Sequence, residues 1–421
     1  MSGRRSDAAG VSHWWPTPAR PSDHFTAAEL SRSADLHGPV RRVRMSALVA
    51  RAALLVAGSV VVTVGPLADR LADAALGVRA AVGAIVVVLA FRLPEPVARR
   101  RLSRLPQVEL VAGERVAPGA VAAAKAGPIL ALTVVASALL GRLVDPSSGW
   151  LVVAGSVAVA LVAGIVSTGI QVQRVTPLTA PPTWERLVER SGAAGVVEFG
   201  ALPGPGSSAR LNACALGYRS PRRILVSPAV LHSAPSQDHT DAVDHGSEVD
   251  GTGPATATRP AQTRPARLPP APAEFVVAHE LHHLAGRHPE AQLALGAVVV
   301  AGAVGAVAAL GPTGWPWSLL GADPSDPAAL PLTVLVAVAG GLATRIPVAW
   351  ALRGLERVAD GGAIDAVGVP GRADARGLLL GAGAELAPPR WSRLLAGHPA
   401  PAQRLEYLAR RRSAAPGSRP G

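Results

Sequence analysis

The segment Ala273–Gly311 reads AEFVVAHELHHLAGRHPEAQLALGAVVVAGAVGAVAALG. Its first part predicts a helix that ends near Gly286, and on that helix His279 and His283 stand four residues apart, so their imidazoles project from one face. Its second part, Ala291–Gly311, carries no charged residue and is long enough to cross a bilayer. A histidine-bearing helix that leads directly into an apolar one predicts an integral-membrane protein with its chemistry at the membrane surface.

The composition agrees with a membrane protein. Of the 421 residues, 49% are hydrophobic and only 17% are charged, whereas soluble domains carry about 25% charged residues. The net charge of +12 comes almost entirely from arginines that flank apolar segments. This pattern favours an orientation signal for the bilayer and argues against a nucleic-acid partner. Cys214 is the only cysteine, which excludes an internal disulfide and a cysteine-based zinc site.

Apolar runs predict about six transmembrane helices. The first run starts near Met45, after a polar tail, so we expect it to remain in the membrane rather than to be cleaved as a signal peptide. Arginine-rich and arginine-poor loops alternate between the runs, which places both termini and the large segment 171–290 on the cytoplasmic side of the cell membrane. The predicted spans are Ser46–Leu67, Ala74–Phe91, Gly127–Val144, Trp150–Ile170, Ala291–Gly311 and Ala328–Arg345.

The spacing of His279, Glu280 and His283 is typical of a zinc hydrolase. Two neutral imidazoles supply half of a tetrahedral zinc shell, and Glu280 is placed to take a proton from metal-bound water. For a chain with 11 histidines and 29 acidic residues in 421, chance alone produces about 0.02 such matches. We therefore expect one Zn²⁺ per chain at this helix. The alternative is a merely polar helix end.

A second helix offers a third ligand. Glu356 and Asp360 are four residues apart and share a helix face. Glu356 would complete a His/His/Glu set, and Asp360 could accept a hydrogen bond from the free ring nitrogen of a ligand histidine. Taken alone, this pair would be an ordinary solvated helix face. From His283 to Ala291 is only about 12 Å if the chain is helical throughout, which predicts a zinc site just beneath the cytoplasmic membrane face.

An ordered series of motifs between Thr183 and Leu408 points to a family. These are NACALG (212–217), ILVS (224–227), HELHH (279–283), ERVAD (356–360) and HPAPAQR (398–404). In this order they resemble the HtpX and CAAX-prenyl-endopeptidase family of membrane-bound zinc metalloproteases. Cys214 stands where that family has an aromatic residue.

The resemblance implies an endopeptidase that cleaves membrane or lipid-modified proteins. It implies zinc bound by His279, His283 and Glu356, with Asn212 on a strand beside the substrate cleft. It also places His398 and Arg404 around the active site. His398 would help to stabilise the tetrahedral oxyanion, or would instead form a buried structural His–Pro turn.

The predicted fold is mostly α, with a membrane region and a cytoplasmic α+β zincin-like catalytic domain that contains a small sheet. We expect a short helix at Thr183–Arg190 and strands at Val196–Gly200, Ala209–Tyr218 and Arg223–Ser227. The division of the chain is a polar tail (1–44), a four-span region (45–170), the first part of the catalytic domain (171–290, with a disordered insertion at 233–272 and the zinc helix at 273–286), a two-span hairpin (291–350), and a second catalytic part with the third ligand and a basic tail (351–421).

The sequence therefore predicts a zinc-dependent endopeptidase of the cytoplasmic membrane that hydrolyses membrane or membrane-proximal proteins. Its partners would be the bilayer and protein or peptide substrates. Two alternatives stay open. A zinc-binding membrane sensor would need an extracellular ligand domain, and the predicted outside loops are short. A non-catalytic metal-binding membrane protein or transporter would need polar residues in its spans, which offer only Ser and Thr. His239 and His245 in the insertion are expected to lie in a solvated loop rather than in a second metal site.

Overall fold

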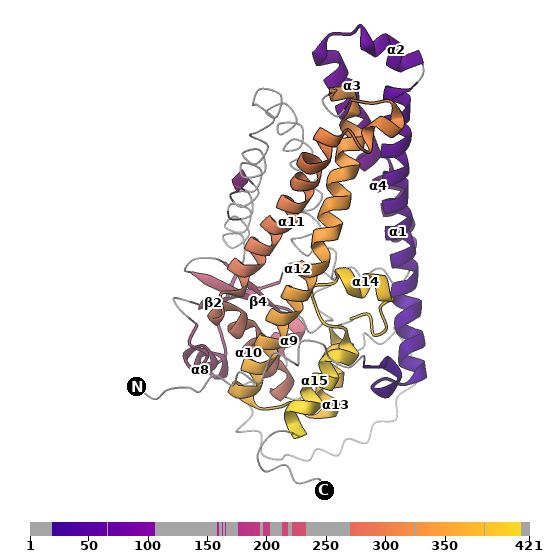
Figure 1. The fold of residues 1–421 in the computed structure, drawn as a ribbon. Helices are drawn as coiled ribbons and strands as arrows, with labels where there is room; N and C mark the ends of the chain where they lie inside the picture. The colour runs from indigo at the N-terminus through magenta and orange to yellow at the C-terminus, as the bar shows by residue number, and fades with distance from the viewer. Residues whose placement is uncertain are drawn as a thin grey trace, which may run out of the picture.

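The structure is a computed structural model of the chain (Figure 1). Within the residues that it describes, the protein is mostly helical and has one small sheet. Figure 1 shows long helices that rise from a lower part containing the sheet. The described residues are 19–64, 66–105, 158–159, 162, 165, 176–193, 197–202, 213–217, 221–232, 270–323, 326–382 and 384–413.

Four stretches of the described helices are long and apolar enough to cross a membrane. Between 11% and 39% of the residues in each apolar window are buried within the protein. Most of this apolar surface is thus left for another apolar medium, which a bilayer supplies. The stretches lie in α1 (Ala27–Thr63), in α3 (Leu76–Arg92) with α4 (Pro94–Ser103), in α11 (His288–Leu310) and in α12 (Leu330–Val367).

These helices coincide with four of the six predicted spans. The other two, Gly127–Val144 and Trp150–Ile170, fall outside the described residues apart from a few isolated positions. The described part of the structure thus has four helices that could span a membrane. The described helices also run past the predicted limits, because apolar composition marks only the part of a helix that lies in lipid.

α1 is the clearest case of such an extension. It begins at Ala27, where Thr26 and Glu29 form a capping box that satisfies two backbone N–H groups at the helix start. Its polar first half is held to the C-terminal part of the chain by the ion pairs Arg376–Glu29 and Arg41–Glu385. The polar stretch that precedes the first predicted span is therefore helical from Ala27 onward and packs against the soluble part.

α11 and α12 form a tightly packed hairpin. Gly302 of α11 lies against Thr344 of α12, and Gly340 of α12 lies against Ala306 and the backbone carbonyl of Gly302. Small residues allow two helix backbones to approach closely, as is common in membranes. The turn between the two helices contains three 3₁₀ segments, namely η6 (Gly311–Thr313), η7 (Trp317–Leu320) and η8 (Pro327–Ala329).

The sheet has four strands in the order β1-β2-β4-β3. β2 and β4 pair in parallel, whereas β1 pairs with β2 and β3 pairs with β4 in the antiparallel sense. β3 is therefore an edge strand among the described residues. The strands are β1 (Pro177–Leu178), β2 (Val197–Ala201), β3 (Ala213–Leu216) and β4 (Arg222–Val226). β2, β3 and β4 overlap the three predicted strands, whereas β1 was not predicted.

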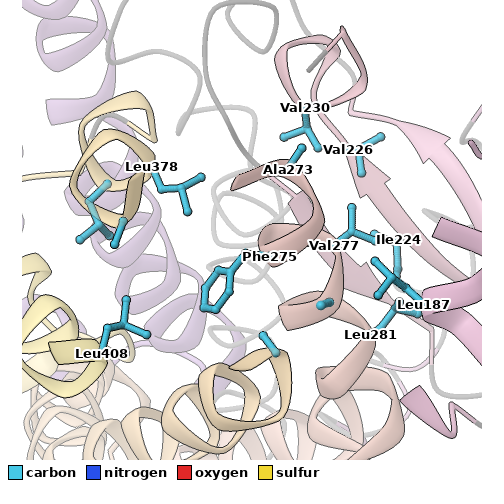
Figure 2. Packing of buried hydrophobic residues seen from close by; sticks show 14 of the residues in the cluster. Leu187, Ile224, Val226, Val230, Ala273, Phe275, Val277, Leu281, Leu378 and Leu408 are labelled. Carbon is cyan, nitrogen blue, oxygen red and sulfur yellow. The ribbon is translucent and has the colours of Figure 1, made fainter. Parts of the chain in front are cut away.

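The largest apolar core forms where the sheet, α8 (Pro182–Ser191) and α10 (Pro270–Ala285) meet. Trp184 of α8 stacks at a tilt on Phe199 of β2, with ring centroids 5.2 Å apart. Figure 2 shows Val277 and Leu281 of α10 on the side that faces Ile224 of β4. The remaining elements of the described part are η2 (Pro21–Asp23), α2 (Pro66–Ala72), α9 (Pro228–His232), α13 (Arg372–Gly381), α14 (Arg390–Leu395) and α15 (Pro401–Ser413).

Candidate metal centre

α10 carries two functional faces. Its apolar face, with Val277 and Leu281 fully buried, fixes the helix against the sheet. His279 and His283 lie on the other face, and each is 5% exposed. With Glu280 they form a group whose ligand atoms all lie within 4.8 Å of one another and which could hold a metal ion. The predicted helix at 273–286 therefore places its histidines as expected.

Glu356 of α12 completes a triangle of ligand atoms. The Nε2 atoms of His279 and His283 are 3.1 Å apart. The Glu356 carboxylate oxygens lie 3.5 Å from Nε2 of His279 and 3.6 Å from Nε2 of His283. Ligands about 2.1 Å from a tetrahedral zinc are about 3.4 Å from one another. The three side chains therefore have the spacing of three corners of a tetrahedral site.

Asp360 and Arg404 support His279 from behind. Asp360 is 1% exposed, and its carboxylate accepts a hydrogen bond from Nδ1 of His279 at 2.9 Å. Nε of Arg404 on α15 donates to both oxygens of the same carboxylate, at 2.8 and 3.0 Å. A carboxylate on Nδ1 fixes the tautomer in which Nε2 has a free lone pair for a metal. Asp360 thus occupies the supporting position predicted for it, and Arg404 neutralises Asp360.

His283 has a support that the sequence reasoning missed. Its Nδ1 lies 2.7 Å from Nδ1 of His288, which is the first residue of α11 and is 3% exposed. The chain returns to His283 because α10 ends at Ala285 and Arg287 adopts a left-handed backbone with φ of 53°. The helix thus ends near Gly286, as predicted, and this break between α10 and α11 brings the two imidazoles together.

Glu280 is anchored by the edge strand. One of its carboxylate oxygens accepts a hydrogen bond from the backbone N–H of Ala215 on β3, at 2.8 Å. Burial raises the pKa of Glu280, and this effect exceeds the opposing influence of His279 and of the Ala215 N–H. A raised pKa makes a carboxylate beside a metal site a stronger base, which favours proton uptake.

His398 lies on the open side of the cluster. Its Nδ1 is 3.1 Å from the Glu356 carboxylate, and its side chain is 82% exposed. The hydrogen bond to Glu356 raises the pKa of His398. Of the two predicted roles, the buried structural turn does not fit this exposure. An imidazole at the mouth of the cluster is in a position to meet a ligand that enters it.

Charges set the protonation of the two α10 histidines in opposite directions. Burial and the Arg404 guanidinium lower the pKa of His279, but the carboxylates of Asp360 and Glu356 outweigh them and raise it to about 9. Burial, with His279 second, lowers the pKa of His283 to about 3. Burial, together with Glu280 and Glu356, raises the pKa of the Cys214 thiol to about 12, so this thiol stays protonated.

The structure brings most of the predicted site residues together, from α10, α12, α15 and the segment that precedes α15. Asn212 is the exception, because it lies outside the described residues, as does the insertion 233–272 with His239 and His245. His282 lies between the two candidate ligands on α10, and its Nδ1 is 2.8 Å from the carbonyl oxygen of Ala278. The stop signal of Gly286 followed by a histidine was the one hint of the His283–His288 pair.

Comparison with known proteins adds no relative to this description: no protein-family model matches the chain, and a search of curated proteins finds no match. The residues themselves therefore carry the functional argument. The donor set of two imidazoles and one carboxylate is one that catalytic zinc sites use, with a fourth position left open. Because each imidazole is also held through its second nitrogen, the cluster has the orienting contacts that such sites need.

Proposed function

We propose that the protein is a zinc-dependent endopeptidase of a cell membrane. The observation that carries this proposal is the triangle of His279, His283 and Glu356, with Glu280 beside it. The motifs that resemble the HtpX and CAAX-prenyl-endopeptidase family support the same conclusion. We further propose that zinc is bound by those three side chains, one ion per chain.

In this proposal the chain's own groups perform the proton transfers. A bound zinc ion would act as a Lewis acid toward the scissile carbonyl and lower the pKa of the attacking water. Glu280 takes the proton of that water and returns it to the leaving amine. The backbone N–H of Ala215 holds one oxygen of Glu280, which leaves the other oxygen for the reaction.

His398 and the supporting pairs have separate roles. The exposed imidazole of His398 donates a hydrogen bond to the developing oxyanion, for which its raised pKa is favourable. Asp360 with Arg404 orients His279, and His288 orients His283. Arg404 bonds Asp360, and its Nη2 also lies 3.1 Å from Nδ1 of His279. We therefore assign it to positioning His279 rather than to contact with the substrate.

The location of the cluster suggests the class of substrate. α10, which carries two of the ligands, leads directly into α11, and α12, the other helix of the apolar hairpin, carries Glu356. The cluster therefore lies close to the end of the lipid-crossing part. We propose six spans, with the termini and the catalytic domain on the cytoplasmic side, on the strength of the alternating arginine-rich loops. The substrates would be membrane proteins or membrane-proximal segments.

The test is the substitution Glu280→Gln in the purified full-length protein. We expect loss of at least about 1,000-fold in peptidase activity, because proton transfer by the general base is lost, while bound zinc measured by mass spectrometry stays at one ion per chain. A His283→Ala variant should lose both zinc and activity. Asp365→Asn, a carboxylate-to-amide change at an exposed position of α12, is the control and should keep both zinc and activity.

The substrates can be sought by comparing membrane proteomes of cells that carry the wild type and the Glu280→Gln form. Intact substrates should accumulate with the inactive enzyme. If Glu280→Gln retains the cellular function of the wild type, the protein is a metal-binding membrane protein rather than a peptidase.

A further inference from the structure

α14 is a short helix with an unusual surface. Its sequence is RWSRLL, and two of its large apolar side chains point outward: Trp391 is 44% exposed and Leu394 is 47% exposed. They are three residues apart and so lie on the same side of the helix. Arg390, at the start of α14, is exposed as well. Tryptophan, leucine and arginine on one side of a helix are typical of the membrane–water interface.

The contacts of α14 with α12 set its level in the molecule. Arg353 of α12 donates hydrogen bonds of 2.8 Å to the carbonyl oxygens of Arg393 and Ala396, the end of α14. A methyl group placed on Gly397 would lie 3.1 Å from Leu352 and 3.7 Å from Arg345. Arg345 closes the apolar part of α12, and Arg353 is the next charged residue. Arg345 and Arg353 are about 12 Å apart along α12. The end of α14 is therefore attached to the stretch of α12 that leaves the lipid.

α1 gives an independent marker on the opposite side. Glu385, five residues before α14 in the sequence, forms an ion pair with Arg41 of α1. Arg41 lies four residues before Met45, where the apolar run of α1 begins. Both ends of the segment 385–397 are thus attached at the level at which two different apolar helices begin or end. In Figure 1, α14 lies between α12 and α1 at about mid-height.

We propose that α14 rests on the headgroup region of the bilayer, with Trp391 and Leu394 inserted among the upper acyl chains. His398 follows α14 directly and reaches Glu356, so this contact with lipid borders the opening of the metal cluster. A membrane-embedded partner that approaches the cluster would pass over α14. The inference rests on the chain crossing a membrane and is independent of peptidase activity.

The bilayer is the occupant that the positions favour. A substrate segment or a second copy of the chain would explain exposed apolar side chains, but neither would require them at the level where both α1 and α12 enter lipid. The guanidinium groups of Arg390 and Arg345 would interact with anionic headgroups at that level. Leu342, eleven residues before Arg353 and therefore on the same face of α12, is 45% exposed.

The test is spin-label accessibility in the full chain. Trp391→Cys and Leu394→Cys are made separately in a Cys214→Ala background, labelled with a thiol-specific nitroxide, and placed in nanodiscs of phosphatidylcholine and phosphatidylglycerol. Accessibility to oxygen and to a water-soluble nickel chelate is then measured by electron paramagnetic resonance. Val298→Cys on α11 is the lipid control, Arg410→Cys on α15 is the aqueous control, and Ser392→Cys is the matched control on α14 itself.

We expect nickel accessibility at positions 391 and 394 to be roughly fivefold or more below that of position 410, because a polar solute is excluded from acyl chains. Oxygen accessibility at positions 391 and 394 should approach that of position 298. Position 392 should be more accessible to nickel than positions 391 and 394. Nickel accessibility equal to that of position 410 would overturn the proposal. Spin–spin broadening that disappears on dilution with unlabelled protein would also overturn it, in favour of a second copy.

Folding of each variant is checked by its zinc content. If Trp391→Cys fails this check, Leu394→Cys decides alone. A further measurement avoids labels: quenching by brominated lipids is compared between the wild type and Trp391→Phe. A smaller quenched fraction in Trp391→Phe supports the proposal, and an unchanged fraction contradicts it.

Discussion

Asp360→Asn is the sharpest test of how the cluster is held. Asp360 is almost fully buried, accepts the Nδ1–H of His279 at 2.9 Å, and receives two hydrogen bonds from Nε of Arg404. The amide has the same shape but no charge. We expect zinc affinity to fall by about 10–100-fold, the usual effect of losing such a support, which corresponds to about 1.4–2.7 kcal/mol.

The same change also leaves Arg404 without its counter-charge. Breaking a buried ion pair from one side destabilises proteins by about 3–5 kcal/mol. Because the Arg404 side chain is 25% exposed, we expect the lower end of that range, about 3 kcal/mol. The double variant Asp360→Asn/Arg404→Gln should recover most of this stability without recovering zinc affinity, since the support of His279 stays weakened.

The two effects are measured separately. Zinc affinity comes from competition with a chromophoric chelator, and stability comes from thermal unfolding of the metal-free protein in detergent. Asp365→Asn, the same chemical change at an exposed position of α12, is the control. If Asp360→Asn and Asp365→Asn bind zinc equally well, Asp360 does not orient His279 and our account of the cluster is wrong.

Three further predictions concern protonation and packing. Since the pKa of metal-free His279 is raised to about 9, a proton competes with zinc at neutral pH; affinity should rise by about tenfold per unit between about pH 6 and pH 8, and a flat titration by chelator competition would contradict this. Gly362→Ala should destabilise the protein by about 1–3 kcal/mol, because the new methyl group would overlap the His282 ring. Gly340→Ala should cost a similar amount in the α11–α12 hairpin, where it meets the backbone of α11. Thermal unfolding tests both, and Gly305→Ala, which meets nothing within 4 Å, should be close to neutral.

Periodicity explains why the ligands themselves could be predicted. Residues four apart in a helix lie on the same face, independently of the tertiary structure. This holds for His279 and His283 and for Glu356 and Asp360. The apolar runs were equally local signals, and all four that fall on described residues are helical. These features depend on a few neighbouring residues, which is the range over which sequence patterns are informative.

Two other supporting contacts, His283–His288 and Ala215–Glu280, could not be predicted in the same way. The His283–His288 pair depends on one left-handed residue, Arg287, and on Gly286, where a methyl group would lie 2.6 Å from the His288 ring. The hydrogen bond from Ala215 to Glu280 depends on the sheet order, in which β4 is inserted between β2 and β3. Strand order and the return of a chain after a turn are set by tertiary packing, which no local period encodes.

The same contacts imply that metal binding and hairpin packing support each other. Both helices of the hairpin reach the cluster: α11 through His288, which holds His283, and α12 through Glu356 and Asp360. If α12 shifted along α11, Glu356 would move away from the two histidines of α10. The position of His288 relative to Glu356 would change at the same time. A ligand triangle with 3.1–3.6 Å edges therefore exists only in one register of α11 against α12, the register that Gly302 and Gly340 permit. By linkage, a bound metal ion would stabilise that register by as much as the register strengthens metal binding.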